Sequence, residues 1–133
     1  MDASIKEFAQ YRLAKADEVY EASRILFEAK QWNSCINRLY YACFYAASAL
    51  LILRGIGAKS HGGVISKFSE TAVLSGEVSS AEYKVYSKLL NWRTKGDYSD
   101  MFDFSEEDVV SVIGPTRQFV DKVKAIISVV ADL

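Results

Sequence analysis

The lone histidine, His61, is the first residue type in this chain that could do chemistry. It falls in the first turn of an expected helix over 61–76, where the positive end of the helix dipole disfavours a proton. A neutral imidazole suits a general base, and the preceding Arg54 and Lys59 could hold a phosphate group. Alternatively, this segment is an exposed turn whose histidine makes only local hydrogen bonds.

A second candidate lies at the end of another expected helix, where Arg93 is followed by Asp97 and Tyr98. Arg93 shares a helical stripe with Tyr86 and Leu90, so it points toward the partly apolar side. It could therefore face a cleft, with Tyr98 at the lip. Alternatively, Arg93 binds the last carbonyl groups of its own helix and pairs with Asp97.

Metal and cofactor chemistry find no support in the sequence. A single histidine and the absence of a Cys-x-x-Cys pair leave no metal site, and no cofactor is predicted. The glycines at 55–57 and 62–63 match no phosphate-binding loop. Any catalysis must therefore use His61, arginines and tyrosines.

The segment 33–55 predicts a helix that is apolar nearly all round. One stripe, at steps of three and four, contains Ile36, Leu39, Cys43, Ala46, Leu50 and Leu53. A second stripe can form hydrogen bonds and contains Ser34, Asn37, Tyr41, Tyr45 and Ser48. Such a helix needs burial on most sides, which predicts a central helix, a homodimer interface, or both. Its tyrosines either pack in the core or line a dimer seam or cleft.

Helices must position all these residues, because no stretch alternates as a half-buried strand does. The chain is predicted to be all-α, a bundle of four or five helices. Capping residues and glycines place the helices at 4–30, 33–55, 61–76, 80–96 and from 105 onward. A capping box is expected at Ser105, and Gly114-Pro115 should kink or split the last helix.

Composition limits the class of protein. The 133 residues predict a single domain, and 50% hydrophobic residues exclude disorder. The net charge is -1, but residues 31–98 carry +4 and residues 99–133 carry -4, so the middle helices could form a basic face. Cys35 and Cys43 read as buried free thiols of a reducing compartment. No signal peptide is visible, and the uncharged run 39–53 is short for a membrane span, which predicts a cytoplasmic protein.

Four segments together resemble the HEPN domain, a small all-α family named for nucleotide binding. They are residues 37–50, 59–65, 93–98 and 118–123. The resemblance implies an antiparallel up-and-down four-helix bundle with an additional short helix, paired as a homodimer. It also implies a prokaryotic setting in which the protein accompanies a minimal nucleotidyltransferase, often as a toxin-antitoxin pair.

Active members of that family resemble one another in an Arg-x(4-6)-His motif near the fourth helix, and two copies meet across the dimer to cleave RNA without metal. In some pairs the nucleotidyltransferase adds AMP to a tyrosine beside the motif, a place that Tyr98 would take here. This chain departs from the motif, because no histidine follows Arg93 in range. Asp97 stands roughly in its place, and a carboxylate is a poor substitute for an imidazole near pH 7.

Two hypotheses follow. In the first, the protein is a binding module whose cleft engages a nucleotidyltransferase, a nucleotide or RNA. The cleft candidates are Asn37, Arg38, Tyr41, Tyr45, Arg54, Lys59, Asp97 and Tyr98. In the second, it is a metal-independent ribonuclease with His61 as the base and Arg93 or Arg54 stabilising the phosphorane charge.

Overall fold

Five α-helices and one π-helical turn make up the described part of the computed structural model. It describes residues 2–98 and 103–132, and within 96–98 it describes the backbone alone. The elements are α1 (Ala3–Glu28), α2 (Trp32–Leu53), α3 (His61–Phe68), the π-helical turn η1 (Ser69–Val73), α4 (Ser80–Tyr98) and α5 (Glu106–Val130). The prediction of an all-α fold is confirmed.

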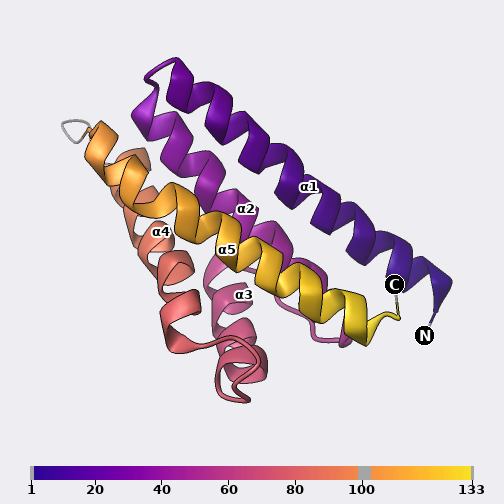
Figure 1. Cartoon of the computed structure of the whole chain (residues 1–133). Helices are drawn as coiled ribbons and strands as arrows, with labels where there is room; N and C mark the ends of the chain where they lie inside the picture. Colours follow the sequence, from indigo (N-terminus) through magenta and orange to yellow (C-terminus); the bar gives the residue numbers. More distant parts are fainter. Residues whose placement is uncertain (1, 99–102, 133) are drawn as a thin grey trace.

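The long helices alternate in direction as an up-and-down bundle does (Figure 1). α1 and α2 form an antiparallel hairpin, and α4 runs back along α5 in the opposite direction. The short α3 and η1 supply the additional helix between α2 and α4. α2 contacts each of the other four α-helices, so it is the central element of the bundle.

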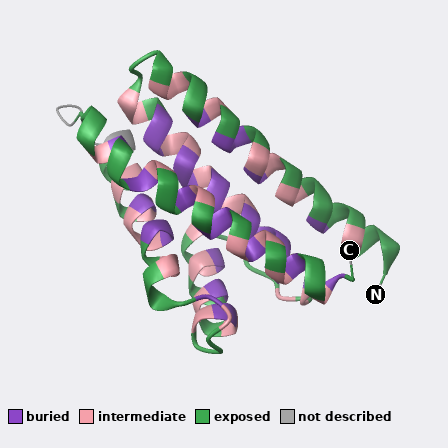
Figure 2. Ribbon diagram, in the orientation of Figure 1, coloured by how far each residue is buried: buried purple, intermediate pink, exposed green. Residues whose placement is uncertain are grey.

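The burial of α2 follows from its composition. Thirteen of its 22 residues are buried, whereas most of α1 in the view of Figure 2 is exposed or intermediate. By length and composition alone α2 could cross a membrane, because the helix continues from residue 39 back to Trp32. Most of it is nevertheless packed against other helices, as the core helix of a soluble protein is. The cytoplasmic location stays a prediction.

Several helix ends follow the capping residues of the sequence, but α2 begins at Trp32, one residue before the predicted start, and its N-cap Gln31 makes no side-chain capping bond. Ser105 and Asp108 form the predicted capping box, with the backbone N–H of each bonded to the side chain of the other. The hydroxyl of Ser60 accepts a hydrogen bond from the N–H of Gly63 at 2.9 Å and so begins α3. Gly55 follows the end of α2 with a φ of +68°, a conformation that glycine adopts without strain.

The predicted split at Pro115 and the predicted end of a helix at Gly96 are wrong, while a kink at Pro115 stays a prediction. Pro115 does not split the last helix, since α5 continues through it from Glu106 to Val130. A proline costs an internal hydrogen bond, but buried Val112 and Phe119 on either side hold both halves against the core. Gly96 does not end α4, whose backbone continues to Tyr98.

The predicted helix over 61–76 changes its winding midway. After Phe68 the chain forms the π-helical turn η1, and the N–H of Leu74 bonds to the carbonyl of Ser69 at 3.0 Å. This wider turn ends at Val73, and the chain then turns through Gly76, which has a φ of +84°. The helical part therefore ends at Val73, before the predicted end at Gly76, and its winding is not regular.

Both cysteines are buried and free, as predicted. Burial raises the pKa of the Cys35 thiol to about 11 and also raises the pKa of Cys43. A thiol with so high a pKa carries little thiolate near neutral pH. These residues therefore serve packing within α2.

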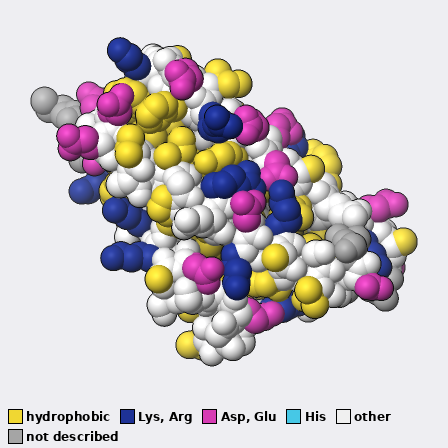
Figure 3. Space-filling model, viewed as in Figure 1, with side chains coloured by type: hydrophobic (Ala, Val, Ile, Leu, Met, Phe, Trp, Pro, Cys, Tyr) yellow, Lys and Arg dark blue, Asp and Glu magenta, His cyan; other side chains and the backbone are white. Residues whose placement is uncertain are grey.

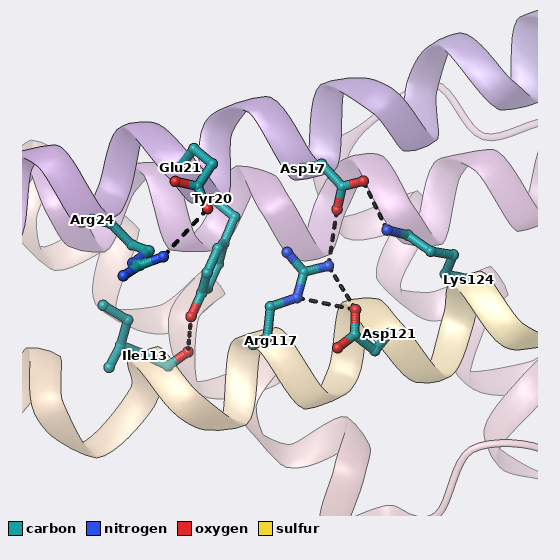
Figure 4. A network of polar contacts seen from close by, with 8 residues as sticks. All are labelled: Asp17, Tyr20, Glu21, Arg24, Ile113, Arg117, Asp121 and Lys124. Atoms are coloured by element: carbon teal, nitrogen blue, oxygen red, sulfur yellow. Dashed lines mark hydrogen bonds and ion pairs between the residues drawn. The ribbon is translucent and has the colours of Figure 1, made fainter.

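A network of charged side chains ties α1 to α5 on the outside of the bundle (Figure 4). Arg117 donates to Asp17 at 2.9 Å and to Asp121 at 2.8 Å, and its guanidinium lies 4.8 Å from the ring centre of Tyr20. Lys124 donates to the other oxygen of Asp17 at 2.7 Å. Partial burial raises the pKa of Asp17, but the hydrogen bonds from Lys124 and Arg117 outweigh it and hold that pKa below its usual value.

Arg117→Gln is expected to lower the free energy of unfolding by about 1 kcal/mol, because it removes two ion pairs and a cation–π contact that are only partly screened. Urea denaturation measures the change. Arg24→Gln is the matched control on the same face, since its exposed pair with Glu21 should contribute only a few tenths of a kcal/mol, roughly. Equal losses in the two variants would contradict a special role for Arg117.

Candidate functional site

One cluster of aromatic rings and cations joins α2, α3 and α4. The adjacent Tyr40 and Tyr41 come from the middle of α2, and His61 is the first residue of α3 because Ser60 caps that helix. Arg93 comes from the last turns of α4. We call this the arginine–tyrosine cluster; it contains Arg38, Tyr40, Tyr41, Phe44, His61 and Arg93.

His61 is held by α2. Its Nδ1 lies 2.6 Å from the hydroxyl of Tyr40, and its ring centre lies 4.6 Å from that of Phe44. The ring of Tyr41 meets it edge-on at 5.7 Å. Partial burial and the positive charge of Arg93 both lower the pKa of His61. Both effects favour the neutral imidazole, as its place at a helix start also does.

Two guanidinium groups lie over the tyrosine rings. Arg93 is 5.2 Å from the ring centre of Tyr40 and 5.4 Å from that of Tyr41, and it donates to the Tyr41 hydroxyl at 3.3 Å. Arg38 lies 5.0 Å from the same Tyr41 ring and is oriented by hydrogen bonds to Asn37. These distances are typical of cation–π contacts, and of the two cations it is Arg93 whose charge reaches His61.

The titration of His61 tests this arrangement. We expect its pKa to lie below the ordinary value of about 6.5, and Arg93→Gln to raise that pKa because a nearby positive charge is removed. As the pH falls below about 6.5, the unfolded chain binds the proton first, so the free energy of unfolding decreases. NMR of the imidazole protons measures the pKa directly, since the chain has one histidine. A pKa above that of the urea-unfolded chain would contradict the burial of His61.

Arg54, a candidate for holding phosphate beside His61, is placed elsewhere. Its two terminal nitrogens donate to the two oxygens of Glu77, at 2.8 and 2.5 Å. The hydrogen bonds from Arg54 lower the pKa of Glu77. This ion pair fastens the end of α2 to the turn before α4, so Arg54 does not join the cluster.

The other candidates from the sequence divide into three groups. Tyr45 is half-buried on α2, where its ring lies 5.7 Å from Tyr41 and 5.5 Å from the guanidinium of Arg12. Lys59 is exposed in the loop before α3. Asp97 and Tyr98 belong to the backbone of α4, but their side chains lie outside the described residues.

Two members of the cluster were not among the sequence candidates, Tyr40 and Phe44. Both lie in the apolar sequence of α2, where an aromatic side chain is expected to belong to the hydrophobic core. Tyr40 is indeed fully buried. The sequence did contain a signal, because the adjacent Tyr40 and Tyr41 place two hydroxyl groups on one helical turn. The sequence alone does not show which partner each hydroxyl reaches.

The cluster borders a hollow, and of the basic side chains of α4 Arg93 belongs to the cluster, while Lys84 and Lys88 lie beside α5. The hollow, of about 260 Å³, borders the cluster at Phe44 and is lined from α1 by Phe8 and Arg12. α4 carries Lys84, Lys88, Arg93 and Lys95. On the face drawn in Figure 3, basic side chains gather along the edge over α4, while acidic and basic ones alternate over α1 and α5.

Known proteins match this chain along most of its length. Residues 9–126 match the family model of the HEPN domain. A protein of Thermotoga maritima named "UPF0332 protein" is 31% identical over 122 residues, covering 92% of each chain. From Methanocaldococcus jannaschii, "Putative toxin MJ0605" is 34% identical, covering 93% of this chain and 92% of its own. "Putative toxin MJ0142" of the same organism is 25% identical, covering 93% and 84%.

Proposed function

The chain belongs to the HEPN family, and from this premise we propose that it binds RNA or a nucleotide at the arginine–tyrosine cluster. The names of two relatives support a toxin-type HEPN protein. In the proposed arrangement it is a homodimer, and a minimal nucleotidyltransferase is its partner. The cluster is the part of the surface that meets the RNA.

The observation that carries the proposal is the placing of Arg38 and Arg93 over one ring, that of Tyr41. Guanidinium groups bind phosphate through paired N–H donors. Aromatic faces and hollows beside them accept bases by stacking, which tolerates any base sequence. The hollow next to Phe44 gives such room. Hydrogen-bond donors for the phosphates and a stacking surface for the bases are together what a protein needs to bind a flexible single strand of RNA.

Fluorescence anisotropy with a labelled single-stranded RNA tests the proposal, at several salt concentrations and in EDTA. Arg38→Gln should weaken binding and reduce the slope of log affinity against log salt by about 0.7, the value for one lost phosphate contact. Arg24→Gln, an exposed position on α1, is the control and should leave both unchanged. Wild-type protein that binds no RNA, or an Arg38→Gln variant that binds equally well, would overturn the proposal.

The proposed assembly has its own tests. Light scattering should report twice the chain mass of 14.9 kDa at micromolar protein. A gene for a minimal nucleotidyltransferase beside this one, and co-elution of the two purified proteins, would support the partner. A monomer at these concentrations would contradict the homodimer.

A second candidate function is a metal-independent ribonuclease. The observation in its favour is that His61 and Arg93 contact the same pair of tyrosines, which brings a candidate base close to a cation able to stabilise a phosphorane. The assay is RNA cleavage in EDTA by wild type, His61→Ala and Arg93→Ala, each confirmed folded by circular dichroism. If the wild type cleaves RNA and neither variant does, the protein is a ribonuclease that uses both residues. If the wild type does not cleave RNA, the ribonuclease hypothesis is wrong and the binding function remains.

A further inference from the structure

The hydrogen bond between Tyr40 and His61 can carry its proton in two ways. Either the Tyr40 hydroxyl donates to Nδ1, or a protonated Nδ1 donates to the hydroxyl oxygen. In the first case the neutral ring carries its proton on Nε2, and in the second Nε2 has a lone pair. A ribonuclease base needs that lone pair, whereas a phosphate ligand needs the N–H.

The burial of Tyr40 distinguishes the two cases. The residue is fully buried, and among the residues that the structure describes its hydroxyl has one hydrogen-bond partner, Nδ1 of His61. Burial also raises the pKa of Tyr40, so the phenol keeps its proton. If Nδ1 were the donor, this phenol proton would have no acceptor in the interior, and a buried donor without an acceptor is unfavourable.

The neighbours of Tyr40 offer no alternative acceptor in the described part of the chain. The rings around it belong to Tyr41, Phe44 and Tyr86, and the guanidinium over it is itself a donor. The hydroxyl of Tyr86 is buried without a hydrogen-bond partner of its own, so it does not receive the Tyr40 proton. The proton of Tyr40 therefore goes to Nδ1.

We propose that Tyr40 is a positioning residue that holds neutral His61 with its proton on Nε2, so that His61 donates a hydrogen bond to a phosphate oxygen of the ligand. Nε2 makes no hydrogen bond within the described chain and is not one of its buried unpaired atoms, so it is open to a ligand. His61 and Arg93 then form a pair of donors on the same two tyrosines. This inference rests on the proposed function, because it assigns His61 a task at that site.

The assignment also separates the two candidate functions. With Nε2 protonated, His61 cannot accept the proton of a ribose 2′-hydroxyl at that atom. Moving the proton to Nδ1 would leave the buried hydroxyl of Tyr40 without an acceptor. The Tyr40–His61 pair therefore favours binding of phosphate over base catalysis by His61.

Nitrogen-15 NMR of the histidine ring tests the tautomer in the wild-type protein, without any ligand. At about pH 8 the ring is neutral, and one histidine gives one unambiguous pair of signals. We expect Nε2 to be the protonated nitrogen and Nδ1 the unprotonated one. A protonated Nδ1 overturns the proposal whatever the protein binds.

Two variants extend the test. Tyr40→Phe should shift the Nδ1 signal and raise the pKa of His61, because the neutral form loses its hydrogen-bond donor. Tyr86→Phe is the matched control, since it removes a buried hydroxyl from a neighbouring ring without touching His61. Should Tyr40→Phe fail to fold, the wild-type tautomer still decides.

Inorganic phosphate serves as the ligand probe. We expect it to move the Nε2–H signal of wild type, and its dissociation constant to rise roughly threefold in Tyr40→Phe and to stay unchanged in Tyr86→Phe. If RNA binds but phosphate leaves Nε2–H unmoved, the inference falls and the proposed function stands. If neither RNA nor phosphate binds, both fall.

Discussion

Arg93→Gln is expected to weaken the binding of single-stranded RNA by roughly tenfold to a hundredfold. A hydrogen bond to a charged group contributes about 1.5 to 3 kcal/mol, and Arg93 offers several such donors beside the Tyr41 ring. The affinity of Arg93→Lys for RNA should lie between those of the wild type and Arg93→Gln. Lysine keeps the positive charge but lacks the planar guanidinium group that stacks on tyrosine. Anisotropy titrations of the three proteins at one salt concentration give the ratios.

Lys88→Gln is the matched control for Arg93→Gln. It removes one positive charge from the same helix, but the ammonium of Lys88 lies over Trp92, outside the arginine–tyrosine cluster. A small loss is expected there, since a charge away from the binding site acts only through the general field. Equal losses in Lys88→Gln and Arg93→Gln would show that net charge alone attracts the RNA, and would count against the cluster.

The fold was largely predictable because its signals are local. Ser60 and Ser105 cap helices by reaching backbone groups three residues ahead, and Gly55 ends α2 through its own backbone freedom. Pro115 misled for the opposite reason. Proline removes a backbone hydrogen bond from the helix, but the stabilisation from packing the surrounding residues against the core exceeds this loss. Such packing cannot be recognised in a short window of sequence.

The sequence predicted which residue types form the candidate site, but it predicted only some of the contacts that these residues make. His61 and Arg93 stand out in the sequence because few other side chains could do chemistry, and the structure places both against Tyr40 and Tyr41. Arg54 has the same chemistry as Arg93, yet it pairs with Glu77. The difference depends on which part of the folded chain each arginine faces, which no spacing along the chain specifies.

Phe119→Ala is expected to have the largest effect on stability, lowering the free energy of unfolding by about 3 to 5 kcal/mol. Phe119 is fully buried on α5, with its ring centre 5.5 Å from those of both Phe68 and Tyr86. Removing the ring loses its transfer energy and leaves a cavity that neighbouring rings cannot fill without moving. Since domains of this kind are stable by about 5 to 15 kcal/mol, the variant should unfold at a far lower urea concentration.

Leu74→Ala provides the comparison, because Leu74 is a large hydrophobic residue that is 80% exposed after η1. Its loss should change the free energy of unfolding by no more than about 0.5 kcal/mol. Tyr86 touches both Phe119 and Tyr40, so a folded Phe119→Ala protein should also shift the imidazole signals of His61. A Phe119→Ala variant as stable as Leu74→Ala would mean that α5 does not pack on the aromatic core, and the rigid support of Tyr40 would lose its basis.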